Sequence, residues 1–182
     1  MPLANQIRII GGHWRGRRVR FPPRQGVRPT PDRVRETLFN WLGQDLAGAS
    51  TLDLFAGSGA LSLEALSRGA ALAVAIDCNP LLVHALASAG ESMGTHRLET
   101  HCMDALAFLA REKRLFDVIF LDPPFDSVRW PELLGAAARR LAIGGALYAE
   151  AATPIAGGQG LGVARRHKAG KVHYHLLRRE AA

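Results

Sequence analysis

Short apolar segments alternate with stretches of helical periodicity from Ser50 to the end of the chain. The apolar segments lie near 51–54, 71–76, 98–102, 116–121 and 145–150. Such alternation predicts parallel strands joined by right-handed helical crossovers. Two later basic segments, 162–166 and 172–178, flank Ala169-Gly170 and predict a closing antiparallel hairpin. We therefore expect an α/β protein with a mostly parallel, seven-stranded sheet.

The first part of the chain has a different pattern. Residues 7–10 and 17–21 are expected to form a hairpin around Gly11-Gly12-His13-Trp14, followed by a loop over 22–29. Thr30 is expected to cap a helix that has Pro31 at its first position. The apolar face of this helix would consist of Val34, Leu38, Trp41 and Leu42.

A glycine-containing turn follows the first apolar segment of the alternating region. The segment from Thr51 to Leu61 consists of a short strand pattern, Gly57-Ser58-Gly59 and the start of a helical pattern. Glycine allows a tight turn and close approach of a ligand, and a helix N-terminus offers free N–H groups. The third glycine of the dinucleotide motif is replaced by Ser62, which weakens a nicotinamide interpretation and leaves nucleoside binding open.

Acidic residues stand at or just beyond the ends of four successive predicted strands: Asp53, Asp77, Asp104 and Asp122. Ligands bind at this edge of an open α/β sheet, and an acid in the position of Asp77 accepts hydrogen bonds from ribose hydroxyls. Helix capping or solvation could account for any one of the four, most of all for Asp104, which opens the helical pattern over 105–111. Four acids in register favour a binding site.

The segment Asp122-Pro123-Pro124-Phe125 directly follows the apolar run 116–121. Two prolines hold the backbone extended and remove its N–H donors, so carbonyl oxygens and the carboxylate of Asp122 are left as acceptors. An exocyclic amine on a nucleobase has hydrogens to donate, and Phe125 could stack on the base. A rigid turn is an equally good explanation of the four residues alone. Together with the glycine turn they favour chemistry at an amino nitrogen.

Basic charge is concentrated at the two ends of the chain. Residues 1–36 carry a net charge of +7, residues 37–162 carry −5, and residues 163–182 carry +5, which sum to the total of +7. Of the 23 basic residues 20 are arginine, the residue that suits bidentate phosphate contacts and stacking on bases. A high-GC genome could explain the preference for arginine, but it does not explain the segregation. The pattern predicts a phosphate-binding rim around a more acidic centre.

These features resemble the S-adenosylmethionine-dependent methyltransferases with a Rossmann-like fold, in which Asp/Asn-Pro-Pro-aromatic marks transfer to an exocyclic amine. A narrower resemblance, to the bacterial 16S rRNA guanine-N2 methyltransferases that modify guanine 966, covers about residues 8–125. It rests on Arg8-Ile9-Ile10-Gly11-Gly12, on the run from Arg28-Pro29-Thr30 through Arg33-Val34-Arg35-Glu36 to Asn40, on 55–61 and on 63–68.

The resemblance implies that the cofactor is S-adenosylmethionine and that no metal is needed. It also implies that the partner is 16S rRNA within an assembled small subunit. Catalytic roles fall on Asp122, Pro123, Pro124 and Phe125. Cofactor contacts fall on Asp53, Phe55, Gly57, Gly59, Asp77 and Asp104, of which Asp104 would hold the adenine amino group. Together with the basic charge at the N-terminal end, it predicts RNA contacts for Arg15, Arg17, Arg18, Arg28, Arg33 and Arg35.

We expect residues 1–45 to form a basic appendage of hairpin and helix, and residues 46–182 to form the methyltransferase domain, in one compact monomeric unit. With no long apolar run and no signal-peptide core, a cytoplasmic protein is expected. Cys78 and Cys102 have no metal-ligand spacing and are expected to be small buried residues. Two alternatives remain: a methyltransferase acting on DNA adenine N6 or protein glutamine N5, and a non-catalytic RNA-binding protein on the same scaffold.

Overall fold

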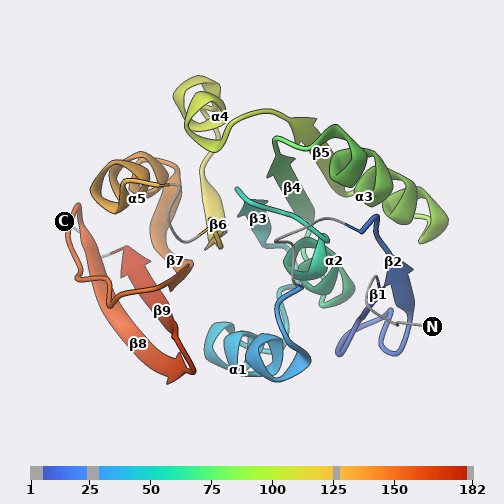
Figure 1. Ribbon diagram of the computed structural model, residues 1–182, viewed down its shortest axis with the longest axis horizontal. Helices are drawn as coiled ribbons and strands as arrows, with labels where there is room; N and C mark the ends of the chain where they lie inside the picture. Colours follow the sequence, from blue (N-terminus) through green and yellow to red (C-terminus); the bar gives the residue numbers. More distant parts are fainter. Residues whose placement is uncertain (1–5, 24–28, 125–127, 180–182) are drawn as a thin grey trace.

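The fold is a three-layer α/β arrangement around a seven-stranded sheet (Figure 1). The computed structural model describes residues 6–23, 29–124 and 128–179. In the sheet the strand order is β5-β4-β3-β6-β7-β9-β8. Strands β3 to β7 are parallel, and β9 pairs antiparallel with both β7 and β8. The predicted α/β class, the parallel sheet and the closing hairpin are confirmed.

The strands of this sheet are β3 (Ser50–Asp53), β4 (Leu72–Asp77), β5 (Leu98–Cys102), β6 (Phe116–Leu121), β7 (Leu141–Ala151), β8 (Leu161–Ala169) and β9 (Val172–Arg179). The helices are α1 (Asp32–Leu42), α2 (Ala60–Ser67), α3 (Pro80–Ser92), α4 (Ala105–Arg111) and α5 (Trp130–Ala138). None of the helices in the described ranges is long and apolar enough to cross a membrane.

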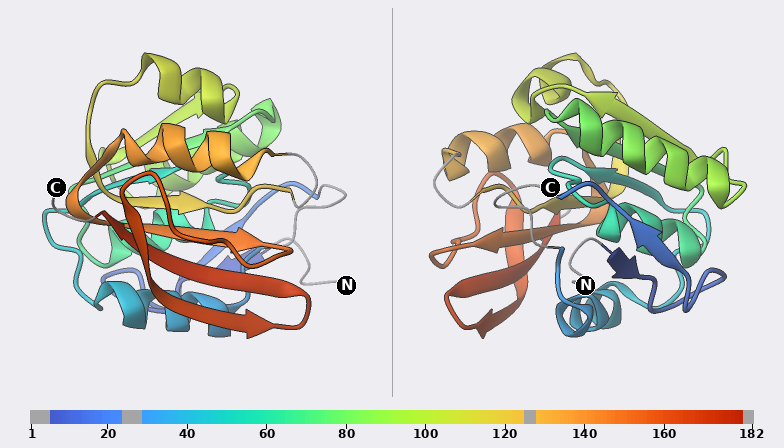
Figure 2. Two further views of the ribbon diagram at one scale, coloured as in Figure 1. Left: turned by 90° about the vertical axis from the view of Figure 1, so that its left-hand side faces the viewer. Right: turned by 45° about the vertical axis from the view of Figure 1, so that its right-hand side comes forward.

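Two cores cover the two faces of the sheet. On one face the side chains of α1, α2 and α3 pack together with those of the N-terminal hairpin, formed by β1 (Gln6–Arg8) and β2 (Arg18–Arg20). On the other face α4 and α5 pack on β6 and β7. Figure 2 shows α1 lying along β8 and β9. The hairpin was predicted and is confirmed.

Every residue of α2 is buried, because the helix lies between the sheet and the N-terminal hairpin. The hairpin approaches α2 so closely that a Cβ on Gly12 would stand 1.9 Å from the carbonyl oxygen of Ser67. Gly12 also has a φ of +72°, a conformation that a residue without a Cβ adopts readily. The Gly11-Gly12 pair is thus a packing requirement of the hairpin turn.

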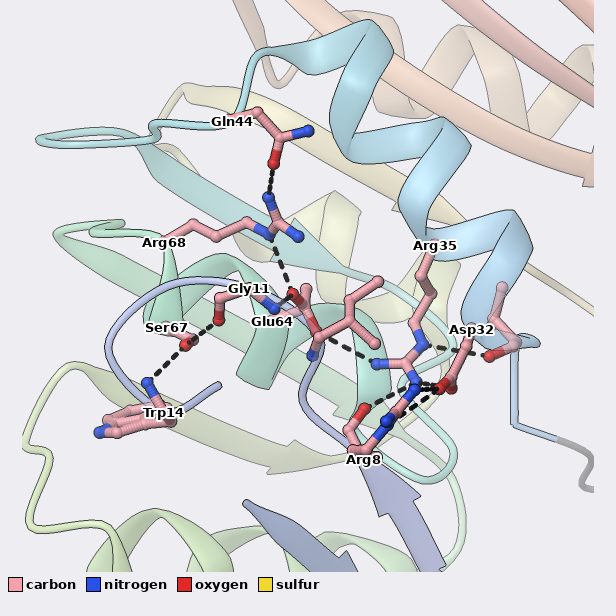
Figure 3. A network of polar contacts seen from close by, with 11 residues as sticks. Arg8, Gly11, Trp14, Asp32, Arg35, Gln44, Glu64, Ser67 and Arg68 are labelled. Atoms are coloured by element: carbon pink, nitrogen blue, oxygen red, sulfur yellow. Dashed lines mark hydrogen bonds and ion pairs between the residues drawn. The ribbon is translucent and has the colours of Figure 1, made fainter. Parts of the chain in front are cut away.

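A buried carboxylate joins the hairpin, α1 and α2 (Figure 3). Glu64 is fully buried and accepts four hydrogen bonds: from the backbone N–H of Ile10 (3.0 Å) and of Gly11 (2.7 Å), from Arg35 (3.1 Å) and from Arg68 (2.9 Å). Both arginines are also nearly inaccessible to solvent. A buried charge is tolerated when it is paired and fully hydrogen-bonded, and Glu64 meets both conditions.

Three details differ from the sequence-based expectation. The side chain of Thr30 makes no cap to α1, because the residue before the helix is Pro31; Thr30 instead lowers the pKa of Glu150 on β7. The buried face of α1 includes Arg35 and Phe39 beside Leu38, because Arg35 has an acidic partner inside the fold. Cys78 and Cys102 are exposed, so the expectation that they are buried was wrong.

We predict that Glu64→Ala destabilises the protein by about 3–5 kcal/mol, because it leaves two buried guanidinium groups and two backbone N–H groups without their acceptor. Chemical denaturation followed by circular dichroism measures the change. Glu36→Ala, at an exposed position of α1, is the matched control and should change stability by less than about 0.5 kcal/mol. Equal midpoints for the two variants would contradict the importance of this network.

Candidate active site

The glycine turn after β3 is held by hydrogen bonds to buried and half-buried carboxyls. Asp53 ends β3, is almost fully buried and accepts a hydrogen bond from the Ser62 hydroxyl at 2.9 Å. Burial, with a smaller contribution from the charge of Asp122, raises the pKa of Asp53 to about 7 against the lowering effect of the Ser62 bond. Ser62, which replaces the third glycine of the dinucleotide motif, therefore orients this carboxyl.

Gly59 begins α2 in the left-handed conformation, with a φ of +77°. A Cβ at this position would lie 2.3 Å from Cδ1 of Leu86 in α3. Glycine is thus required both by the backbone conformation and by the close approach of α3. The predicted strand, turn and helix arrangement is present.

Asp77 ends β4 and faces the same turn. Its carboxylate accepts hydrogen bonds from the backbone N–H of Gly57 (2.9 Å) and from that of Asn79 (2.8 Å). A small hollow beside it is lined by Ala56, Gly57, Ala75, Asp77, Leu82, Val83, Leu86 and Thr100. The fold brings Gly57 and Asp77 together, and the bond to Gly57 fixes the shape of the turn.

Asp104 and Phe55 occupy the same edge of the sheet with different surroundings. Asp104 is exposed and caps α4, accepting a hydrogen bond from the N–H of Ala107 at 2.9 Å. The capping function that the sequence left open for this residue is therefore present. Phe55 is half-buried and packs against the core on the α4 and α5 side.

Asp122, Pro123 and Pro124 directly follow β6, the strand next to β3. Pro123 is buried and Pro124 is exposed. Burial raises the pKa of the Asp122 carboxyl to about 7. Phe125, the predicted stacking residue, lies outside the described residues.

A third acidic residue, Glu150, stands beside Asp122 and was missed in the sequence. Leu121 pairs with Ala149 across β6 and β7, so the next residues along, Asp122 and Glu150, are neighbours. Glu150 is buried and accepts a hydrogen bond from the Tyr148 hydroxyl at 3.0 Å. Burial raises its pKa to about 8, and the charge of Asp122 contributes to the increase. The sequence signal was an isolated acid in the apolar run 146–151.

Asp53, Asp122 and Glu150 thus form an acidic cluster at the carboxyl ends of three adjacent strands, β3, β6 and β7. Their raised pKa values mean that protonated and ionised forms coexist near neutral pH. Groups in this state can accept or give up a proton during a reaction. In the described part of the chain no group of three or more His, Cys, Asp or Glu side chains is arranged to hold a metal ion.

The arginines that were predicted to contact RNA divide into two groups. Arg15, Arg17 and Arg18, on the N-terminal hairpin, and Arg33, on α1, are exposed. Arg35 is 1% exposed, and its guanidinium bonds to Glu64, Asp32 (2.5 Å), the Arg8 carbonyl (2.8 Å) and the Thr30 carbonyl. The folded protein therefore cannot present Arg35 to a phosphate, and the prediction of an RNA contact there is withdrawn. Arg28 lies outside the described residues.

The strand order, the glycine turn after the first parallel strand and the acids at the strand ends define the Rossmann-like methyltransferase fold. The chain belongs to the family described as conserved hypothetical protein 95, whose model matches residues 7–178. The family resemblance indicated by the sequence is confirmed.

Several known proteins are similar to this chain. The ribosomal RNA small subunit methyltransferase D of Escherichia coli (strain K12) is 47% identical over 122 residues, which are 67% of this chain and 62% of that relative. The match thus spans less than two thirds of the relative's length. A solved structure of a candidate methyltransferase of E. coli, yhhF, superposes with a TM-score of 0.88 at 40% identity, covering 97% of this chain and 99% of that one. A Haemophilus influenzae structure gives 0.83 at 29% identity, with 97% and 99% covered.

We predict that Glu150→Gln makes the protein more stable relative to the parent as the pH increases. The folded-state pKa of Glu150 is raised to about 8, so the folded state retains a proton that the unfolded chain releases near pH 4.5. Parental stability therefore decreases as the pH rises from about 4.5 to 8. Glutamine does not ionise, and the variant should gain at least about 1 kcal/mol over the parent between pH 5 and pH 8, since one pKa unit corresponds to about 1.4 kcal/mol.

Urea denaturation at both pH values measures this gain. Glu36→Gln, which removes an exposed carboxyl from α1, is the matched control. A variant whose stability tracks that of the parent at both pH values would show that Glu150 titrates normally.

Proposed function

We propose that this protein transfers a methyl group from S-adenosylmethionine to the exocyclic N2 amine of a guanine in 16S rRNA. The observation that carries the proposal is the juxtaposition of two motifs on adjacent strands. The glycine turn follows β3, and Asp122-Pro123-Pro124 follows β6, so a nucleoside cofactor and an amine acceptor can meet at one edge. The name of the E. coli relative supports ribosomal RNA of the small subunit as the substrate.

The proposed cofactor site is the hollow between the glycine turn and β4. Gly57 lines this hollow and would contact the methionine part and the ribose, and the carboxylate of Asp77 would accept the ribose hydroxyls while it stays bound to the turn. Gly59, whose Cβ side is occupied by Leu86, would contribute through its backbone. We assign supporting contacts to Asp53 and Phe55, and contact with the adenine amino group to Asp104. When bound, S-adenosylmethionine supplies a methyl group on a positively charged sulfur, ready for in-line displacement.

The acceptor site is proposed at the end of β6. The N2 amine of guanine is a weak nucleophile, since its lone pair is delocalised into the ring. Hydrogen bonds from the amine to the Asp122 carboxylate and the Pro123 carbonyl would turn the lone pair toward the methyl group. Asp122 would then take the proton that the methylated nitrogen must lose. A base in this position must leave its stack. We assign Pro124 and Phe125 to the same acceptor site.

The pair Asp122 and Glu150 favours guanine over adenine. Guanine presents two adjacent donors, N1–H and N2–H₂, on its Watson–Crick edge, whereas adenine presents an acceptor at N1. Two neighbouring carboxyls are acceptors that match both guanine donors. Asp122-Pro123-Pro124 alone fits any exocyclic amine, and Glu150 adds the preference for guanine. We further propose that the enzyme works in the cytoplasm as a monomer on the small ribosomal subunit, with residues 46–182 as its methyltransferase domain.

The proposal is tested by incubating the purified protein and labelled S-adenosylmethionine with small ribosomal subunits from cells that lack the gene. The expected product is N2-methylguanine in 16S rRNA. Labelled DNA adenine or protein glutamine would support the other amine methyltransferases instead. Binding of RNA without binding of S-adenosylmethionine in calorimetry would support the non-catalytic alternative.

We predict that Asp122→Ala lowers the single-turnover rate of methyl transfer about a hundredfold or more, equivalent to roughly 3 kcal/mol, with little change in cofactor affinity. At subsaturating RNA the parental rate should rise as the pH increases through about 7, because only the ionised Asp122 can take the proton from the methylated nitrogen. Transfer by the alanine variant at the parental rate would mean that Asp122 is a turn residue only.

We predict that reversing Arg15, Arg17 and Arg18 to glutamate weakens RNA binding and reduces its salt dependence, because phosphate contacts release counterions. Cofactor affinity should not change. Filter binding at several salt concentrations gives the slope. Reversal of the exposed Arg111, Lys113 and Arg139 changes the net charge equally and is the control. Equal slopes for the two triple variants would show that the hairpin charge is not a specific RNA contact.

A further inference from the structure

A cavity of about 240 Å³ lies between α1 and the last three strands of the sheet, apart from the glycine turn and the proline segment. It is lined by Arg33, Val34, Thr37, Leu38 and Trp41 of α1, Tyr148 of β7, Tyr174 of β9, and His167 and Ala169 of β8. An apolar cavity of about 150 Å³ can hold benzene. This cavity therefore has room for a larger aromatic ring, and its lining includes polar groups as well.

Three aromatic rings form one wall of the cavity. Tyr148 and Tyr174 lie 6.4 Å apart with an interplanar angle of 15°, and His167 lies 6.2 Å from Tyr174 at 22°. The rings come from three neighbouring strands, so they lie nearly parallel, side by side across the sheet. His167 is exposed, whereas Tyr148 and Tyr174 are 1% and 6% exposed and line the buried part of the cavity. An exposed ring on a sheet is a surface on which single-stranded nucleic acids stack their bases.

Positive charge surrounds the open part of this wall. Arg33 lines the cavity from α1, and it is exposed and has no ion-pair partner among residues 6–23, 29–124 and 128–179. On β8 the alternation of side chains puts Arg165 on the same face as His167 and Ala169. An arginine on each side suits the phosphates of a nucleotide whose base enters the cavity.

Tyr148, which lines the cavity, links it to the acidic cluster through one hydrogen bond. The Tyr148 hydroxyl donates to Glu150, and Glu150 stands beside Asp122. A nucleotide in the cavity would therefore lie next to the proposed acceptor site and could belong to the same RNA strand.

We propose that this cavity binds an unpaired nucleobase of the RNA, one that neighbours the methylated base in the chain. The proposal rests on the proposed function for the identity of the RNA. Stacking on the exposed ring of His167, with Tyr174 beside it, would hold the neighbouring base without reading its sequence, while Arg33 and Arg165 contact its phosphates. Holding the neighbour outside the helical stack would help to present the target base at the proline segment.

The test uses a variant that fills the cavity and one that removes part of its wall. Ala169→Trp adds a ring at an exposed cavity-lining position, and Tyr174→Leu removes the central ring but keeps an apolar side chain. Each should weaken binding of a fluorescein-labelled unstructured oligoribonucleotide about 5-fold to 150-fold, the range that corresponds to one stacked base. Ala110→Trp, at an exposed position of α4 on the other face, is the matched control and should bind as the parent does.

Methylation of small subunits separates the outcomes. The proposal expects Ala169→Trp to need more RNA for half-maximal rate while the single-turnover rate at saturation stays parental. A lower rate at saturation would place the methylated base itself in the cavity and overturn the proposal, and so would parental oligoribonucleotide affinity in both variants. If the parent binds the oligoribonucleotide through this cavity but transfers no methyl group to any RNA, the proposed function fails and the binding site stands.

Discussion

The position of the N-terminal hairpin and α1 depends on the carboxylate of Glu64. This side chain is buried in α2, and its four acceptor contacts reach the hairpin backbone, α1 and a second arginine of its own helix. Arg68 in turn lies 4.6 Å from the centre of the Phe39 ring on α1 and bonds to Gln44. Since a buried carboxylate is unfavourable unless all these bonds form together, the network accepts only one placement of α1 against the sheet.

That placement determines the geometry at the carboxyl edge. Arg35 holds the Thr30 carbonyl at the start of α1, and the Thr30 hydroxyl reaches Glu150. Through Glu150 the N-terminal segment touches the acidic cluster, and through Arg33 and Trp41 it forms one side of the aromatic cavity. The described part of the block that starts at Arg28, one of the segments on which the family resemblance rests, therefore connects the appendage to the site and is not simply a basic surface. We interpret its arginines individually: one is a buried structural residue and one faces the cavity.

The sequence predicted the elements that depend on local pattern. Alternating apolar segments identified the parallel strands, the glycines identified the turn before α2, and the acids at the strand ends located the edge where the site lies. It did not reveal which charges are neutralised inside the fold. Arg35 and Glu64 lie 29 residues apart, and only the packing of α1 on α2 brings them together. Glu150 was missed for the same reason, because its partners come from β6 and from the start of α1.

The charge distribution resolves a conflict in the proposed reaction. A site with three carboxyls would repel RNA phosphates if all three were ionised. Burial raises the pKa values of Asp53, Asp122 and Glu150 to about 7–8, with repulsion from neighbouring carboxylates contributing for Asp53 and Glu150, so much of this negative charge is absent near neutral pH. The exposed arginines then dominate the approach of the RNA. A base that donates hydrogen bonds to Asp122 and Glu150 favours their ionised forms, so the negative charge develops only when the amine that needs it is in place. In this way an acidic centre and a basic rim can serve the same polyanionic substrate.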